Sequence, residues 1–135
     1  MELRQTNPRQ QGSIGEAIAA SWRIQAGYGI WIPFGHSPDC DLVAERDNPL
    51  LRIQVKTSTV LRRGRWEVAI CTRGGNRSWN GVVKKLDPKR YDYLFVVVAD
   101  GRCWFIPSNE MNASSCIRLG GPKYARFEVN TPTRP

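Results

Sequence analysis

The sequence predicts an α/β sandwich, a single domain in which a mixed sheet packs against helices. Three observations predict this class: an amphipathic helical segment near the N-terminus, several short strand-like segments after it, and a continuous apolar run at residues 93–98. Such a run is typical of a strand that is covered on both faces. The length of 135 residues is enough for one domain with a core of its own.

The N-terminal region divides into an arm and a helix. Residues 1–11 are polar and hold almost no apolar side chains, which predicts a flexible or loosely attached arm. Apolar side chains then recur at helical spacing through Ile14, Ile18 and Trp22, and Gly27 follows them. We therefore predict a helix over residues 14–26, a domain over residues 12–130 and a tail over residues 131–135.

Segments rich in aliphatic, β-branched and aromatic residues predict the strands of the sheet. The clearest pair is a hairpin of residues 93–98 and 103–106, joined by a tight turn at Asp100-Gly101. Ser108 predicts the cap of a short helix. The other expected strands are residues 28–34, 40–45, 51–57, 66–72 and, more weakly, 124–129, with turns or loops at 35–39, 46–49, 62–65 and 74–78.

The strands at 40–45 and 51–57 bring polar side chains together. Side chains alternate between the faces of a strand, so Gln54 and Lys56 share the face opposite to that of the apolar residues Ile53 and Val55. If the turn is centred between residues 47 and 48, opposed residues have numbers that sum to about 95, which places Asp41 opposite Gln54. The pattern therefore predicts an acid, an amide and an amine at one point.

Such a cluster suits phosphodiester hydrolysis. A carboxylate beside an amide carbonyl offers two hard oxygen ligands of the kind that bind Mg²⁺, which usually keeps several waters and shares phosphate oxygens with its substrate. A nearby lysine can activate the attacking water or stabilise the negative charge that builds on the phosphate.

The charge balance favours a polyanionic partner. Twenty Lys and Arg against twelve Asp and Glu give a formal charge of +8, although a basic soluble protein with no such partner has the same composition. Basic residues gather in the middle of the chain with Trp66 and Trp79 among them, a mixture that can contact phosphates and stack on bases; a core position is favoured for Trp66. The candidate DNA-binding residues are Arg62, Arg63, Arg65, Arg73, Arg77, Lys84 and Lys85.

Cysteine and histidine usage excludes several site classes. The four cysteines, Cys40, Cys71, Cys103 and Cys116, form no Cys-x-x-Cys pair, so a zinc site is not supported and free thiols are expected. The single histidine, His36, excludes nucleases that need two histidines. No apolar stretch is long enough for a membrane span or a signal segment, so we expect a cytoplasmic protein without membrane contact.

Three short motifs together resemble the PD-(D/E)XK nuclease superfamily. They are Gly12-Ser13-Ile14-Gly15-Glu16, Asp41-Leu42-Val43 and Gln54-Val55-Lys56, the last in the variant where glutamine replaces the second acid. With Tyr91-Asp92-Tyr93-Leu94 and Trp104-Phe105-Ile106-Pro107, the pattern is similar to the homing endonucleases associated with group I introns. The similarity spans residues 12–112.

The resemblance implies a restriction-endonuclease-like fold and a Mg²⁺-dependent, site-specific endonuclease acting on double-stranded DNA. It implies that Asp41 is the central metal ligand and that Glu16 and Gln54 are further ligands. Lys56 is then the catalytic base or electrostatic stabiliser. Since one small domain supplies one active site, cutting both strands requires a homo-oligomer, a dimer or a tetramer.

Alternatives remain for individual residues and for the function. Asp39 in Pro38-Asp39 competes with Asp41, and Glu16 also completes a Ser13-x-x-Glu16 capping box, in which it would only close the start of a helix. The amide at Gln54 removes one negative charge, which weakens metal binding. A Holliday-junction resolvase and a non-catalytic DNA-binding module with the nuclease fold are therefore the alternative functions.

Overall fold

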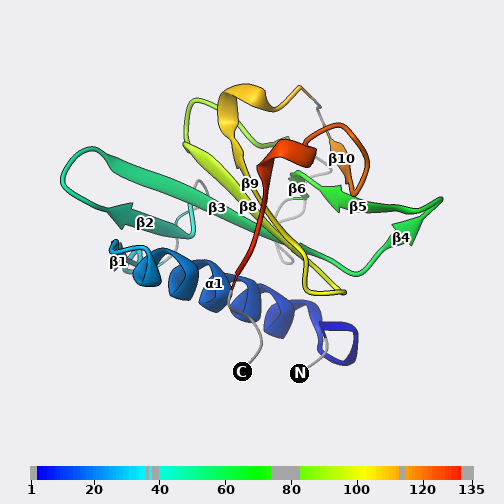
Figure 1. The fold of residues 1–135 in the computed structure, drawn as a ribbon, viewed down its shortest axis with the longest axis horizontal. Helices are drawn as coiled ribbons and strands as arrows, with labels where there is room; N and C mark the ends of the chain where they lie inside the picture. The colour runs from blue at the N-terminus through cyan, green and yellow to red at the C-terminus, as the bar shows by residue number, and fades with distance from the viewer. Residues whose placement is uncertain (1–2, 36, 38–39, 74–82, 113–114, 132–135) are drawn as a thin grey trace.

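The computed structural model describes residues 3–35, 37, 40–73, 83–112 and 115–131 (Figure 1). Its helices are η1 (Leu3–Gln5), α1 (Pro8–Gln25), η2 (Ser108–Glu110) and η3 (Ala125–Phe127), where η denotes a 3₁₀ turn. Its strands are β1 (Gly29–Trp31), β2 (Leu42–Glu45), β3 (Leu50–Ser58), β4 (Leu61–Arg62), β5 (Arg65–Ala69), β6 (Cys71–Arg73), β7 (Val83–Lys85), β8 (Tyr93–Val98), β9 (Cys103–Pro107), β10 (Cys116–Leu119) and β11 (Glu128–Val129).

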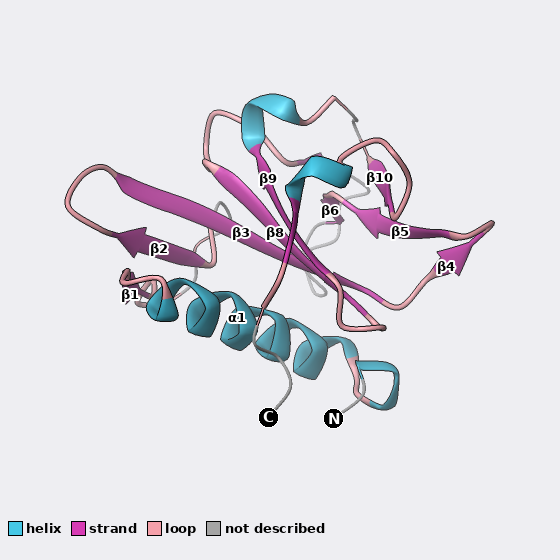
Figure 2. Cartoon of the chain, in the orientation of Figure 1, coloured by secondary structure: helices cyan, strands magenta, loops and turns pink. Residues whose placement is uncertain are grey.

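A six-stranded sheet in the order β1-β2-β3-β8-β9-β11 forms the centre of the domain (Figure 2). Strands β3 and β8 are parallel and the other neighbours are antiparallel, so the sheet is mixed. Helix α1 packs on one face, and a three-stranded sheet in the order β10-β5-β4 packs on the other. The predicted α/β sandwich is confirmed.

The apolar run in β8 contributes to two cores, one on each face of the large sheet. Leu94, Val96 and Val98 face the small sheet, whereas Phe95 and Val97 face helix α1. All five side chains are buried, which confirms the prediction of a doubly covered strand. Burial of each such side chain contributes about 1.5–3 kcal/mol, so this strand anchors both layers.

The expected arm at residues 1–11 is wrong for the residues that the structure describes. Helix α1 begins at Pro8, and Asn7 caps it: Gln10 N donates to Asn7 Oδ1 (2.9 Å), and Asn7 N donates to Gln10 Oε1 (3.1 Å). Leu3 is buried in the core beside the helix. Reciprocal capping and a proline at N1 start this helix without any apolar residue in the first turn, so the apolar pattern missed it.

The capping box considered as the alternative role of Ser13 and Glu16 is absent. Ser13 lies inside α1, where its hydroxyl donates to the Arg9 carbonyl (3.2 Å). Glu16 is therefore not needed to close the helix start.

The register predicted for the strands around Asp41 is confirmed. Leu42 pairs with Ile53 and Glu45 with Leu50, so the turn is centred between residues 47 and 48. Asp47 has φ of 58°, a left-handed conformation that Asp tolerates in tight turns. The hairpin of β8 and β9 is confirmed as well, with Gly101 at φ 93° in its turn.

Three local predictions differ from the structure. The strand expected at 66–72 divides at Ile70, because β5 pairs with β4 and β10 whereas β6 pairs with β7 in a different sheet. Residues 125–127 form a 3₁₀ turn and only Glu128–Val129 pair as a strand. Ser108 makes no capping hydrogen bond, because η2 already begins at it. Strands β4, β7 and β10 were not predicted, and β1 is shorter than the expected 28–34.

Other expectations concern the thiols, the aromatic residues and membrane spans. Cys40, Cys71, Cys103 and Cys116 are free, and Trp66 lies in the core, as predicted. In the described part of the chain, no helix combines the length and apolarity that a membrane crossing requires. His36, Asp39, Arg77 and Trp79 lie outside the described residues.

Candidate active site

Asp41 lies directly before the first residue of β2, Leu42. Its N–H continues the ladder by donating to the Ile53 carbonyl (2.9 Å). Its carboxylate oxygen Oδ2 then accepts from the Val55 N–H (2.8 Å) and from Gln54 Nε2 (3.0 Å). The carboxylate therefore accepts hydrogen bonds from two residues of β3 at the point where β2 begins, and these bonds hold it in one orientation.

Gln54 is buried, although it lies on the face of β3 opposite to that of Ile53 and Val55. The small sheet covers this face of β3, which the strand pattern alone could not show. Its amide nitrogen is used by Asp41, but within the described residues its Oε1 atom has no hydrogen-bond partner. A buried acceptor without a partner costs about 1–3 kcal/mol, so this oxygen is suited to a ligand.

Glu16 extends from α1 toward Asp41. Burial raises the pKa of Glu16 first, and the negative charge of Asp41 and a side-chain hydrogen bond with Asp41 raise it further. Two carboxyl groups that share a site favour retention of a proton or the binding of a cation. Glu16 and Asp41 therefore form a pair of acids that a bound cation would stabilise.

A close contact between α1 and β3 allows Glu16 to reach this position. A Cβ atom placed on Gly15 would lie 2.7 Å from Thr57 Cγ2 and 3.1 Å from Val55 Cγ1. Because real Cβ atoms do not approach so closely, a glycine is required at the crossing of the helix over the strand. The Gly-Glu pair in the first motif thus combines a packing residue with a site residue.

Lys56 follows Gln54 on the same face of β3 and is half-buried. Burial lowers its pKa, and electrostatic interactions with Asp41 and Cys71 only partly oppose this effect. A lysine with a lowered pKa loses its proton more readily, which suits a base, and its ammonium form can stabilise an anion at short range.

The donor set fits a hard divalent cation. Glu16, Asp41 and the free Oε1 of Gln54 offer three oxygen atoms from one helix and the two strands. The described residues contain no group of three or more His, Cys, Asp and Glu that could hold a metal, so the amide oxygen is needed to complete the set. Mg²⁺ accepts such a set because it keeps several waters.

The predicted basic residues fall into two groups. Arg62, Arg63 and Arg65 lie on the β4–β5 hairpin, where Arg63 and Gly64 form its turn with φ of 51° and 73°. Arg73 lies on β6, and Lys84 and Lys85 lie on β7, where they pair with residues of β6. Sequence reasoning missed Arg118 on β10, although the alternation Cys116-Ile117-Arg118-Leu119 is a strand pattern that marks it as outward-facing.

Comparisons with known proteins agree with the resemblance. The sequence matches the family model described as PD-(D/E)XK endonuclease over residues 6–131. A solved structure described as a bacterial homing endonuclease, I-Ssp6803I, has a TM-score of 0.79 and 21% sequence identity, with 91% of this chain and 89% of that chain covered. The search of curated proteins gave no match. Similarity at this identity shows the fold, and the family match over nearly the whole sequence shows that the chain belongs to the PD-(D/E)XK endonuclease family.

Proposed function

We propose that the protein is a Mg²⁺-dependent DNA endonuclease that hydrolyses phosphodiester bonds, with Glu16, Asp41, Gln54 and Lys56 as its active site. The observation that carries the proposal is the buried Oε1 atom of Gln54, which lacks a partner among the described residues beside two coupled carboxyl groups. If the cluster only stabilised the fold, we would expect a hydrogen-bond donor for Gln54 Oε1 and a larger separation between Glu16 and Asp41.

Each side chain has a distinct role in this proposal. Glu16, Asp41 and Gln54 would hold Mg²⁺, which neutralises phosphate charge and supplies water of lowered pKa when bound. Val55 N–H fixes the orientation of the Asp41 carboxylate. Lys56 takes a proton from the attacking water or stabilises the phosphate charge, and its lowered pKa supports the first role.

Double-stranded DNA is the proposed substrate, cleaved at specific sites in the manner of a homing enzyme. The formal charge of +8 supports a polyanion, and the similar solved structure is described as a homing endonuclease. The predicted contacts from Arg62, Arg63, Arg65, Arg73, Arg77, Lys84 and Lys85 belong to this proposal. An enzyme acting on cellular DNA is expected inside the cell.

We also propose a homo-oligomer, a dimer or a tetramer. Trp31, Ile32 and Phe34 are large, exposed apolar residues at and just beyond β1, which is an edge strand of the large sheet. Exposed apolar side chains at a sheet edge favour association. Light scattering should give a mass of at least two chains, and Trp31→Lys with Phe34→Lys should lower it.

Cleavage of linear, supercoiled and four-way-junction DNA tests the enzymatic proposal. We expect cutting with Mg²⁺, none with EDTA, and loss of cutting in Asp41→Ala and Lys56→Ala while DNA binding persists. Discrete fragments from linear DNA support a homing enzyme, and products from junctions alone support a resolvase. If either variant cleaves at nearly the parental rate, the assigned site is wrong.

A non-catalytic DNA-binding module is the second candidate, because Gln54 leaves the metal set with two carboxylates. It predicts DNA binding without cutting in either Mg²⁺ or Mn²⁺. It also predicts that Asp41→Ala binds DNA as well as the parent or better, because the variant removes a negative charge near phosphate.

A further inference from the structure

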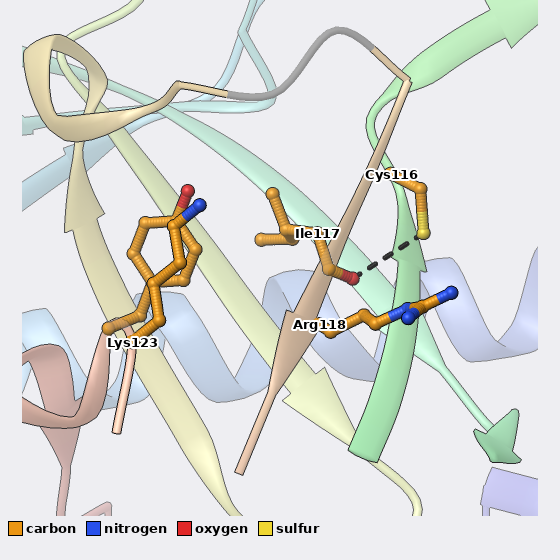
Figure 3. Close-up of a pocket in the computed structure, with 5 residues that line it drawn as sticks. Cys116, Ile117, Arg118 and Lys123 are labelled. Atoms are coloured by element: carbon orange, nitrogen blue, oxygen red, sulfur yellow. Dashed lines mark hydrogen bonds between the residues drawn. The ribbon is translucent and has the colours of Figure 1, made fainter. Parts of the chain in front are cut away.

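The small sheet has one apolar and one charged face. Trp66 and Val68 on β5, with Ile117 and Leu119 on β10, point into the core. The alternate residues therefore point outward. Figure 3 shows this for β10, where Cys116 and Arg118 extend on one side of the strand and Ile117 on the other.

Three arginines from three neighbouring strands share the outward face. Arg62 on β4 pairs with Arg65 on β5, and Arg118 on β10 pairs with Glu67, two residues after Arg65. We call the surface formed by Arg62, Arg65 and Arg118 the arginine face. The backbones of β4 and β10 lie about 10 Å apart across β5, which equals about three base-pair steps along the DNA axis.

Glu67 lies between the arginines without neutralising them. Its carboxylate is 3.8 Å from Arg62 Nε and 3.6 Å from Arg118 Nη2, both longer than a hydrogen bond. The Arg62 and Arg118 side chains are 71% and 67% exposed, so water weakens these pairs. Because one glutamate lies among three arginines, the surface keeps a net positive charge, and the guanidinium groups of Arg62 and Arg118 are accessible to solvent.

Arg65 is positioned by a close contact with the loop after β10. A side chain on Gly121 would overlap the guanidinium of Arg65, so the glycine leaves the space that this group occupies. Arg65 Nη1 also donates to the Gly64 carbonyl (3.2 Å). The Arg65 side chain therefore lies against this loop and remains exposed to solvent.

The arginine face is connected to the active site through β5. Ser58, the last residue of β3, donates its hydroxyl to the Glu67 carbonyl. Two residues beyond the end of β5, Cys71 is close enough to Lys56 to affect its pKa. Strand β5 therefore joins the arginine face to a segment that lies close to Lys56.

We propose that Arg62, Arg65 and Arg118 bind consecutive backbone phosphates of duplex DNA and deliver the duplex to the active site. The proposal rests on the proposed nuclease function and adds Arg118 and the outward face of the β10-β5-β4 sheet to it. Guanidinium groups suit this role because their planar donors match phosphate oxygens. Contacts with phosphates position the duplex and carry no direct sequence information.

The salt dependence of binding to a 30-base-pair duplex in EDTA tests the proposal. Each lost phosphate contact reduces the slope of log affinity against log salt by about 0.9, so Arg62→Gln with Arg118→Gln should reduce it by about 1.8. The control is Arg126→Gln, which removes one charge from an arginine of 70% exposure that is also paired with a glutamate (Glu110, 2.9 Å). The control should leave the slope unchanged.

Cys116 provides a second readout on the same face. Its thiol is exposed two residues from Arg118, whereas Cys103 is buried and burial raises its pKa to about 11. Saturating duplex should slow alkylation of Cys116 by iodoacetamide several-fold in the parent. Alkylation of Cys103 should stay slow with or without DNA, and both rates come from peptide mass spectrometry.

These outcomes separate the arginine face from the nuclease function. A reduced slope with no cutting in Mg²⁺ supports the arginine face and rejects the nuclease. Metal-dependent cutting with an unchanged slope in the double variant and no protection of Cys116 overturns the arginine face alone. A parent that binds no duplex overturns both.

Discussion

The two halves of strand β3 each carry one basic side chain, Arg52 or Lys56, close to an acidic side chain from another element, but the two environments differ. In the first half, Arg52 is paired with Asp92: the Arg52 N–H donates to Asp92 Oδ2 (2.7 Å), and Nη2 donates to Oδ1 (3.2 Å). In the second half, Lys56 lies near Asp41, and Asp41 also interacts with Glu16. The acid beside Arg52 is paired with a base, whereas the acid beside Lys56 also interacts with a second acid.

The pKa values show the same difference. Burial alone would raise the pKa of Asp92, but the hydrogen bonds and charge of Arg52 outweigh it and lower that pKa. Burial raises the pKa of Glu16 and lowers that of Lys56, so each is shifted toward its neutral form. Arg52 stabilises the charged form of Asp92. At Glu16 and at Lys56, burial favours the neutral form instead, and pKa values shifted in this way are common at functional sites.

The largest expected effect is the loss of DNA cleavage rate in the Lys56→Met variant. The variant removes the proposed base, so the cleavage rate should fall by about 10²–10⁴-fold. Arg52→Met, on the same strand, should keep most of the activity of the folded protein. Rates are measured on one DNA substrate at equal bound fractions, and equal losses in the two variants would contradict the division of β3 into two functional halves.

Gly15→Val tests whether the cluster depends on close packing of the helix. The added side chain overlaps Thr57 and Val55, so α1 must move away from β3. We expect destabilisation of about 1–3 kcal/mol by urea unfolding and loss of cutting in the fraction that stays folded. Gly12→Val is the matched control, because nothing lies within 4 Å of a Cβ placed there.

Asp92→Ala should lower stability more than Asp41→Ala. It removes the carboxylate that accepts from the Arg52 backbone N–H and from its guanidinium, at a cost of about 1–3 kcal/mol. Asp41→Ala also removes the hydrogen bonds from Val55 N–H and Gln54 Nε2, but it relieves the repulsion with Glu16, so its net cost is expected to be smaller. Urea midpoints at pH 7 measure both, and the reverse order would show that the two halves do not differ as described.

The smallest expected effect is a pH-dependent gain in stability from Glu16→Gln. The folded protein holds the Glu16 proton more tightly than the unfolded chain does, because the pKa of Glu16 is raised above 4.5. As pH rises from about that value, the unfolded chain loses its proton first, so the parent loses stability relative to the variant. The melting temperature of the variant relative to the parent should therefore be higher at pH 7 than at pH 4, measured without added metal.

Much of the site could be predicted because it depends on local rules. Alternation along β3 and a tight turn at Asp47 and Asn48 were enough to place Asp41 opposite Gln54, and the register confirms it. The start of α1 was missed because polar capping by Asn7 and Gln10 replaced the apolar pattern. Arg118 was missed because its strand is short and pairs with β5, far away in the sequence.

The sequence by itself determined the fold class, the β2–β3 register and the residue types of the cluster, since alternation and turn geometry act over a few residues. Only the tertiary structure decided that Gln54 is buried, that Gly15 brings Glu16 to Asp41, and that Arg62, Arg65 and Arg118 share a face. Burial and the pKa shifts that follow from it depend on which distant segments cover a surface. The alternation of residues within one strand does not show which distant segments will cover it.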